Sequence, residues 1–160
     1  MITFFNVKRK ETNDLMRNEL KAVVVPHLFQ HGFSGKLPSF RRVKDGSCQT
    51  LDIQFNRYGK SFAVNLSIVD SSPDFMRIPY DRLRRLRSQR LGTRDKRIRR
   101  KLNMDHWFRF LRGFIFYRQS YSAAARSTVA LFDSEADVIY RDLLTAIERG
   151  VSCIHLEPTT

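Results

Sequence analysis

Cysteine, glycine and long apolar runs are all scarce in this sequence, and each scarcity argues against a class of protein. The two cysteines, Cys48 and Cys153, have no second cysteine at the spacing of a zinc motif, and we expect no disulfide between them. The seven glycines are scattered and form no phosphate-binding loop. No segment approaches the roughly 18 consecutive apolar residues of a membrane span, so we expect no membrane association.

What the chain does contain is typical of one globular domain. Its 160 residues are 42% hydrophobic and 28% charged, which is the composition of a folded chain. We predict a single domain over residues 1–160, with its core within residues 12–150. The first ten residues place apolar side chains before charged ones, the reverse of a secretory signal, so we expect a cytoplasmic protein.

A first helix is predicted over residues 12–31, where apolar residues recur at helical spacing. Thr12 or Asn13 is the expected N-cap. Pro26 is expected to kink the helix or to end its first part, because proline lacks the backbone N–H that a helix interior needs. Gly32 is the expected stop.

A second helix is predicted from about residue 133 to residue 149. Asp133 or Ser134 is the expected N-cap, and Gly150 is the expected end. One face carries apolar residues at helical spacing, namely Ala136, Ile139, Tyr140, Leu143, Leu144 and Ile147.

Between the two helices, alternating apolar and polar residues predict an antiparallel sheet. A strand at residues 40–44 is followed by a turn at Asp45 and Gly46. The next two strands form a hairpin with one apolar face. Its simplest register pairs Phe55 with Phe62, Ile53 with Val64 and Leu51 with Leu66, and on the other face Asp52 with Asn65 and Gln54 with Ala63. The sequence therefore predicts an α+β fold, with an antiparallel sheet of about four to five strands packed by N-terminal and C-terminal helices.

The strongest feature is a basic segment at residues 77–101, inserted between the sheet and an aromatic run. It holds twelve cationic side chains against two aspartates, so it carries ten of the net +13 charges of the chain. Leu83 and Leu86, at positions i and i+3, indicate that part of it is helical. The aromatic run at residues 107–117 is predicted to be strand-like or a short buried segment.

Such a density of one charge repels itself, which favours an anionic partner. Ten of the twelve cations are arginines, whose planar guanidinium suits carboxylates and phosphates. We expect an acidic protein surface as the partner, and the alternative is a nucleic-acid backbone. The predicted contact residues are Arg84, Arg85, Arg87, Arg90, Arg94, Arg97, Arg99, Arg100 and Lys101.

Two pairs of residues suggest chemistry. His27 and His31 share a helix face at spacing i and i+4, but the sequence shows no carboxylate partner, so we expect no metal and assign the pair to the helix C-terminus. Asp105 precedes His106 and could orient it for acid–base work, yet no nucleophile can be assigned beside it. A candidate polar cluster comprises Asp52, Gln54, Asn65, Asp105 and His106.

Known catalytic motifs such as HExxH and GxSxG are missing from the sequence. We therefore expect no enzyme activity and no cofactor. An enzyme built on Asp105, His106 and the arginines, acting on a phosphorylated substrate, is the third hypothesis after protein binding and nucleic-acid binding.

Several short segments, taken in order, resemble a bacterial family called domain of unknown function 4304. The resemblance covers roughly residues 12–150. It rests on His31-Gly32-Phe33, Phe40-Arg41-Arg42, Gln54, the strand from Phe62 to Leu66 with Asn65, Arg90-Leu91-Gly92 and Asp105-His106-Trp107-Phe108. The basic residues from Arg94 to Lys101 depart from the family pattern.

The resemblance implies no reaction. Domains that look like this one often occur in bacterial genomes near secreted toxins, where small single domains act as immunity proteins. We therefore expect a non-enzymatic protein-binding domain, specifically an immunity protein that neutralises a cognate toxin through its basic surface. A nucleic-acid-binding module that contacts phosphates through the arginines is the alternative.

Overall fold

The computed structural model describes residues 2–92, 106–110 and 121–149, and for residues 2–10 it describes the backbone alone. The order of elements along the chain is α1 (Ile2–Gln30), β1 (Ser34–Lys36), β2 (Ser39–Lys44), β3 (Ser47–Phe55), β4 (Ser61–Val69), η1 (Tyr80–Arg82), β5 (Arg85–Arg90), β6 (Phe108–Arg109) and α3 (Tyr121–Glu148). None of the helices in this part of the chain is both long and apolar enough to cross a membrane.

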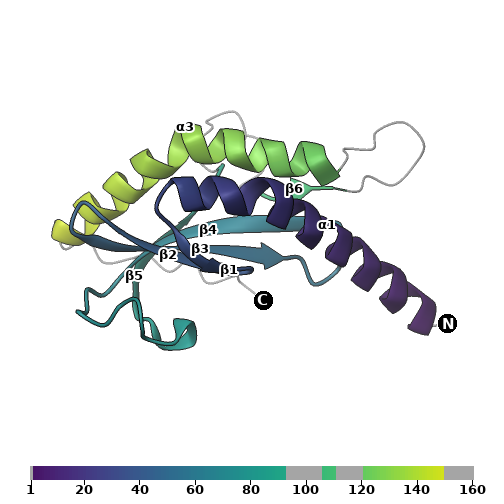
Figure 1. Cartoon of the computed structure of the whole chain (residues 1–160), viewed down its shortest axis with the longest axis horizontal. Helices are drawn as coiled ribbons and strands as arrows, with labels where there is room; N and C mark the ends of the chain where they lie inside the picture. Colours follow the sequence, from purple (N-terminus) through teal and green to yellow (C-terminus); the bar gives the residue numbers. More distant parts are fainter. Residues whose placement is uncertain (1, 93–105, 111–120, 150–160) are drawn as a thin grey trace.

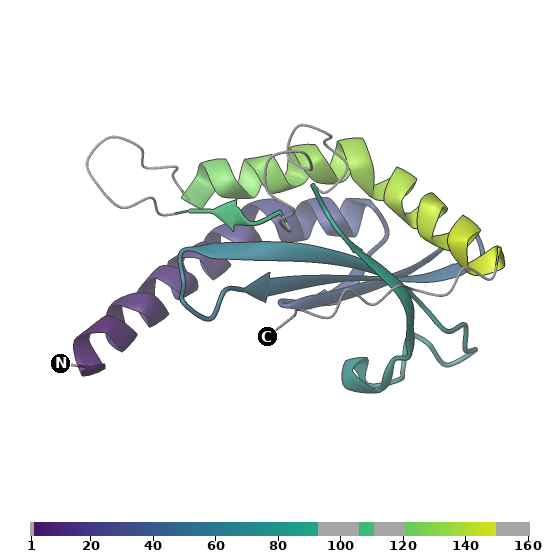
Figure 2. The same ribbon diagram turned by 180° about the vertical axis from the view of Figure 1, so that it is seen from behind.

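The strands form one antiparallel sheet in the order β1-β2-β3-β4-β5, and β6 pairs with the start of β4. Helices α1 and α3 lie side by side on one face, as Figures 1 and 2 show. The segment between β4 and β5, with η1, lies on the other face (Figure 2). This arrangement confirms the predicted α+β class, with six strands because the short β1 and β6 also pair.

The central hairpin has the predicted register. Phe55 pairs with Phe62, Ile53 with Val64 and Leu51 with Leu66. These side chains belong to the main core, which α1 and α3 close from above. Alternation along a strand sends every second side chain to the opposite face. Asp52 and Asn65, which also pair as predicted, therefore lie on the face away from the helices.

A second, smaller apolar cluster covers part of that other face. Cys48 and Val69 are paired across β3 and β4, and Phe75 and Leu83 pack against them. Arg41 holds this segment in place, because its Nη1 donates to the carbonyls of Phe75 and Ile78 at 2.7 and 2.8 Å. The sheet is thus covered on both faces near Cys48 and Val69. The covering segment leads directly into β5.

Helix α1 is longer than predicted and is not ended by Pro26. It begins at Ile2, so Thr12 and Asn13 lie inside the helix and not at its N-cap position. The ring of Pro26 leaves the carbonyl of Ala22 without its helical donor. Both residues are exposed, so water can satisfy that carbonyl and the helix continues to Gln30.

The end of α1 is the predicted one. Gly32 has a φ of +79°, a conformation that glycine adopts at little cost. The N–H of Phe33 donates to the carbonyl of Leu28 and that of Gly32 to the carbonyl of Phe29, both at 3.0 Å. This is the Schellman pattern, and it folds Phe33 back into the core.

Helix α3 begins at Tyr121, twelve residues before the predicted start. Its first turns are rich in alanine, the best helix former, and Ala124 and Ala125 are buried in the core. Asp133 and Ser134, which have the side chains of an N-cap, lie in the helix interior instead. The predicted apolar face is correct: Ala136, Ile139, Tyr140 and Leu143 are buried, and Leu144 and Ile147 pack against them.

The basic segment is also different from the prediction. The stretch around Leu83 and Leu86 is not helical; residues 85–90 form strand β5, which pairs with β4. The aromatic run contributes strand β6 at Phe108–Arg109, as predicted for its beginning. Residues 93–105, 111–120 and 150–160 lie outside the described residues, and with them the rest of the aromatic run and the Gly150 stop.

Candidate functional site

Strand β5 places its arginines along an edge of the sheet. Within the described residues, β5 pairs with β4 on one side and has no partner strand on the other. Arg84 and Arg85 are exposed, and Arg87 and Arg90 are half-buried. The remaining predicted contact residues, which are Arg94, Arg97, Arg99, Arg100 and Lys101, lie outside the described part of the chain.

The arginines at the two ends of β5 are tied to the polar face of the sheet. Arg85 Nη2 donates to Asp52 Oδ2 at 2.9 Å, and Ser39 Oγ donates to the other carboxylate oxygen at 2.8 Å. At the other end, Arg90 Nε donates to Asn65 Oδ1 at 3.1 Å, and Asn65 Nδ2 donates to Gln54 Oε1 at 3.2 Å. The structure therefore brings together three members of the predicted polar cluster and joins them to the basic strand.

Arg87 Nη2 is buried and has no hydrogen-bond partner within the described residues. A buried donor without an acceptor costs about 1–3 kcal/mol of stability. The basic strand thus holds an unsatisfied donor as well as a surplus of charge: residues 77–92 carry six arginines and one aspartate.

Trp107 lies against this strand. The guanidinium carbon of Arg90 is 4.9 Å from the centre of the Trp107 ring, a cation–π contact. The aromatic run that begins at Trp107 was predicted to be strand-like or buried, and the structure places Trp107 half-buried beside Arg90. The pairing joins segments on either side of residues 93–105, and no local pattern in the sequence indicates it.

The His106 ring packs against the end of β5 and against β6. It meets Phe108 edge-on, with centroids 4.7 Å apart, and it lies so close to Gly92 that a Cβ there would be 2.5 Å from the imidazole. Burial lowers the pKa of His106 below 6.5, against an opposing effect of the Glu135 carboxylate. Glu135 itself accepts a hydrogen bond from the Gly92 N–H at 2.9 Å. Asp105, the predicted orienting carboxylate, lies outside the described residues.

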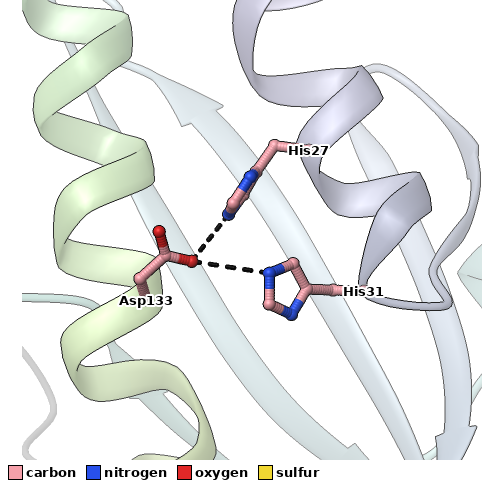
Figure 3. Close-up of side chains that lie close together, drawn as sticks. All are labelled: His27, His31 and Asp133. Atoms are coloured by element: carbon pink, nitrogen blue, oxygen red, sulfur yellow. Dashed lines mark hydrogen bonds and ion pairs between the residues drawn. The ribbon is translucent and has the colours of Figure 1, made fainter.

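A second cluster joins the end of α1 to the middle of α3. Figure 3 shows His27 and His31 pointing at the same carboxylate oxygen of Asp133. His27 Nε2 is 2.7 Å and His31 Nε2 is 3.5 Å from Asp133 Oδ1. One ligand atom from each of the three residues lies within 4.8 Å of the others. The sequence showed the histidine pair but not the aspartate, which is 106 residues after His27 and has the appearance of a helix cap.

Next to this cluster, the buried side chain of Arg42, which is 2% exposed, connects β3, the turn after α1 and α3. It donates to Gln49 Oε1 at 2.8 Å, to the His31 carbonyl at 2.9 Å and to Asp137 Oδ1 at 3.0 Å. The hydrogen bond from Lys44 and the one from Arg42 lower the pKa of Asp137, although partial desolvation opposes them. Arg42 and Lys44 therefore form ion pairs with Asp137, whereas Asp133, one turn earlier on α3, contacts the two histidines.

Comparison with known proteins gives one match. A family model described as domain of unknown function (DUF4304) matches residues 24–113, which is more than half of the chain and includes β1 to β6. No curated protein and no solved structure matches.

Proposed function

The chain belongs to the DUF4304 family, and from this premise we propose that it is a non-enzymatic protein-binding domain whose contact surface is the arginine-bearing edge of the sheet. The observation that carries the proposal is the position of Arg85 and Arg87 on β5 and of Arg84 directly before it. Among the described residues this strand pairs with another strand on one side only, and Arg87 Nη2 is buried without an acceptor.

An edge strand with this charge favours an acidic protein partner. Positive side chains on an edge strand oppose pairing with a second copy of the same chain. An acidic surface of another protein would meet the exposed guanidinium groups of Arg84 and Arg85. Opposite charge on the two surfaces would also speed the encounter.

The surroundings of Trp107 favour protein over nucleic acid. Recognition of single-stranded nucleic acid uses exposed aromatic rings as stacking platforms between basic side chains. The Trp107 ring, which contacts the basic strand, is engaged by Arg90 and half-buried. The capture experiment below distinguishes a protein partner from nucleic acid bound through its phosphates alone.

The non-enzymatic part of the proposal is supported by the roles of the candidate acid–base residues. Asp52 accepts hydrogen bonds from Ser39 and Arg85, and His106 is packed between Phe108 and Gly92 with a lowered pKa. These residues hold the polar face and the β5 end together. If His106→Gln kept its fold but lost an activity on a phosphorylated substrate, the enzyme hypothesis would replace this one.

We extend the proposal to an immunity protein that neutralises a toxin in the cytoplasm of its own cell. The family resemblance motivates this step. Because the edge is basic, the toxin domain would present an acidic surface to it. The neighbouring upstream gene is then expected to encode a larger protein with an acidic C-terminal domain. An isolated gene would argue against the immunity role but not against protein binding.

The experiment that tests the proposal is affinity capture of partners from the native cells by the tagged full chain, with and without nuclease. We expect one stoichiometric protein, with an acidic domain, that remains bound after nuclease treatment. Recovery of nucleic acid alone, lost as salt rises, would contradict the proposal, since phosphate contacts weaken steeply with salt.

A further inference from the structure

We propose that His27, His31 and Asp133 form a Zn²⁺ site that links the end of α1 to the middle of α3. Two imidazoles and one carboxylate are a ligand set that zinc accepts, and three protein ligands leave one tetrahedral position to water or another ligand. The helix spacing of i and i+4 puts both imidazoles on one face, and the packing of α3 against α1 brings the carboxylate to them (Figure 3).

The distances suit an ion. A tetrahedral zinc with bonds of about 2.0–2.1 Å separates its ligand atoms by roughly 3.3 Å. The two separations from Asp133 Oδ1, 2.7 Å to His27 and 3.5 Å to His31, lie on either side of that value. The ligand atoms of the two histidines lie within 4.8 Å of each other, so all three separations are close to those of a coordinated ion.

Neighbouring side chains restrict the orientation of the two imidazoles, and the three ligands remain accessible to an ion from solvent. The ring of Phe132 packs edge-on against His31 and His27, with centroids 5.2 and 5.9 Å apart, which limits the orientations of both imidazoles. The three side chains are 20%, 37% and 48% exposed, so an ion can reach them from solvent. Asp137 is held by Arg42 and Lys44 and does not compete for a place in the site.

A zinc ion here would act as a cross-link between elements far apart in the chain. It would bind the folded chain, where the three ligands are together, and not the unfolded one. Zinc should then raise the melting temperature by about 5–10 °C at a hundredfold excess over the Kd. This inference does not depend on the proposed partner.

The test uses the untagged full chain and zinc alone. We expect calorimetry to show one ion per chain and a melting temperature that rises with zinc. Cobalt should give the visible absorption bands of a tetrahedral site. His31→Gln and Asp133→Asn should each weaken zinc binding by more than about tenfold and abolish the shift in melting temperature.

The control separates this site from others. Asp142→Asn removes an α3 aspartate outside the cluster, and this variant should keep the binding and the shift. If Asp133→Asn and His31→Gln keep the zinc-induced shift, or if the wild-type chain shows none at millimolar zinc, the three side chains form hydrogen bonds only and the inference is wrong. Circular dichroism confirms that each variant is folded.

Discussion

At the scale of single residues, His106 shows how burial changes the role of an ionisable group. The sequence pair Asp105-His106 suggests acid–base chemistry, whereas the imidazole lies against Phe108 and Gly92 and has a pKa below 6.5. The reason is tertiary: Gly92 and His106 meet because β5 and β6 both pair with β4. Neighbouring residues in sequence could not indicate that contact.

The lowered pKa predicts a pH dependence of stability. The unfolded chain protonates this imidazole near pH 6.5, while the folded chain resists protonation until a lower pH. The contribution of His106 is therefore complete above about pH 6.5 and is lost as the pH falls through the folded pKa. We expect the free energy of unfolding to decrease between pH 7.5 and pH 5, and His106→Gln to remove part of that decrease.

Urea unfolding at several pH values measures this, and an NMR titration of the imidazole resonances gives the pKa directly. A His106 pKa at or above 6.5 would show that the ring is not buried as described.

At the scale of elements, three adjacent residues on β2 have three different tasks. Phe40 belongs to the main core, Arg41 holds the segment that covers the other face, and Arg42 joins β2 to α3 and to the turn after α1. The guanidinium carbon of Arg42 also lies 4.4 Å from the centre of the Phe33 ring. Each of the three side chains therefore ties β2 to a different part of the fold.

Loss of the Arg42 side chain should therefore lower the stability of the fold, because it removes hydrogen bonds to β3, to the turn after α1 and to α3. Arg42→Met keeps the length but leaves the buried Gln49 Oε1 and the His31 carbonyl without this donor. We expect a loss of about 3 kcal/mol in the free energy of unfolding. Arg42→Lys should lie between, because an ammonium group cannot reproduce the planar set of donors.

Urea unfolding of these variants measures the effect, and Arg141→Met, at an exposed position on α3, is the control with an expected change below about 0.5 kcal/mol. Equal stability of Arg42→Met and wild type would mean that apolar packing replaces the hydrogen bonds, so that Arg42 holds nothing together.

The elements also show how far the sequence could predict this fold. The register of the β3–β4 hairpin follows from period-two alternation, since a shift by one residue would turn the core side chains to the other face. The start of α3 could not be predicted, because Asp133 and Ser134 match a cap and only packing against α1 shows that they lie inside the helix. Asp133 was missed as a site residue for the same reason.

At the scale of the whole molecule, the charge is unevenly placed on a compact two-layer fold. Sequence reasoning located the basic segment, but the structure adds that its first part is an edge strand of the sheet, joined to Asp52 and Asn65. Composition gives the amount of charge in a segment. Only strand pairing gives the surface on which that charge lies, and β5 pairs through contacts that the local sequence does not specify.

Arg85 and Arg87 of β5, and Arg84 directly before it, are therefore expected to dominate binding to the captured protein, beyond their effect on net charge. Arg84→Gln, Arg85→Gln and Arg87→Gln combined remove three charges from the edge. Lys21→Gln, Arg126→Gln and Arg141→Gln combined remove three charges from exposed positions on the helices. Both triple variants have the same net charge, so long-range attraction falls equally and local contact alone distinguishes them.

The most direct test is the Kd of each triple variant for the captured partner, measured by titration calorimetry at a fixed salt concentration. We expect a loss of affinity of about 100-fold for the β5 variant and less than about threefold for the helix variant, because direct contacts with a carboxylate are lost only in the first. Equal losses in the two variants, or full affinity in the β5 variant, would contradict the proposal that this edge is the contact surface.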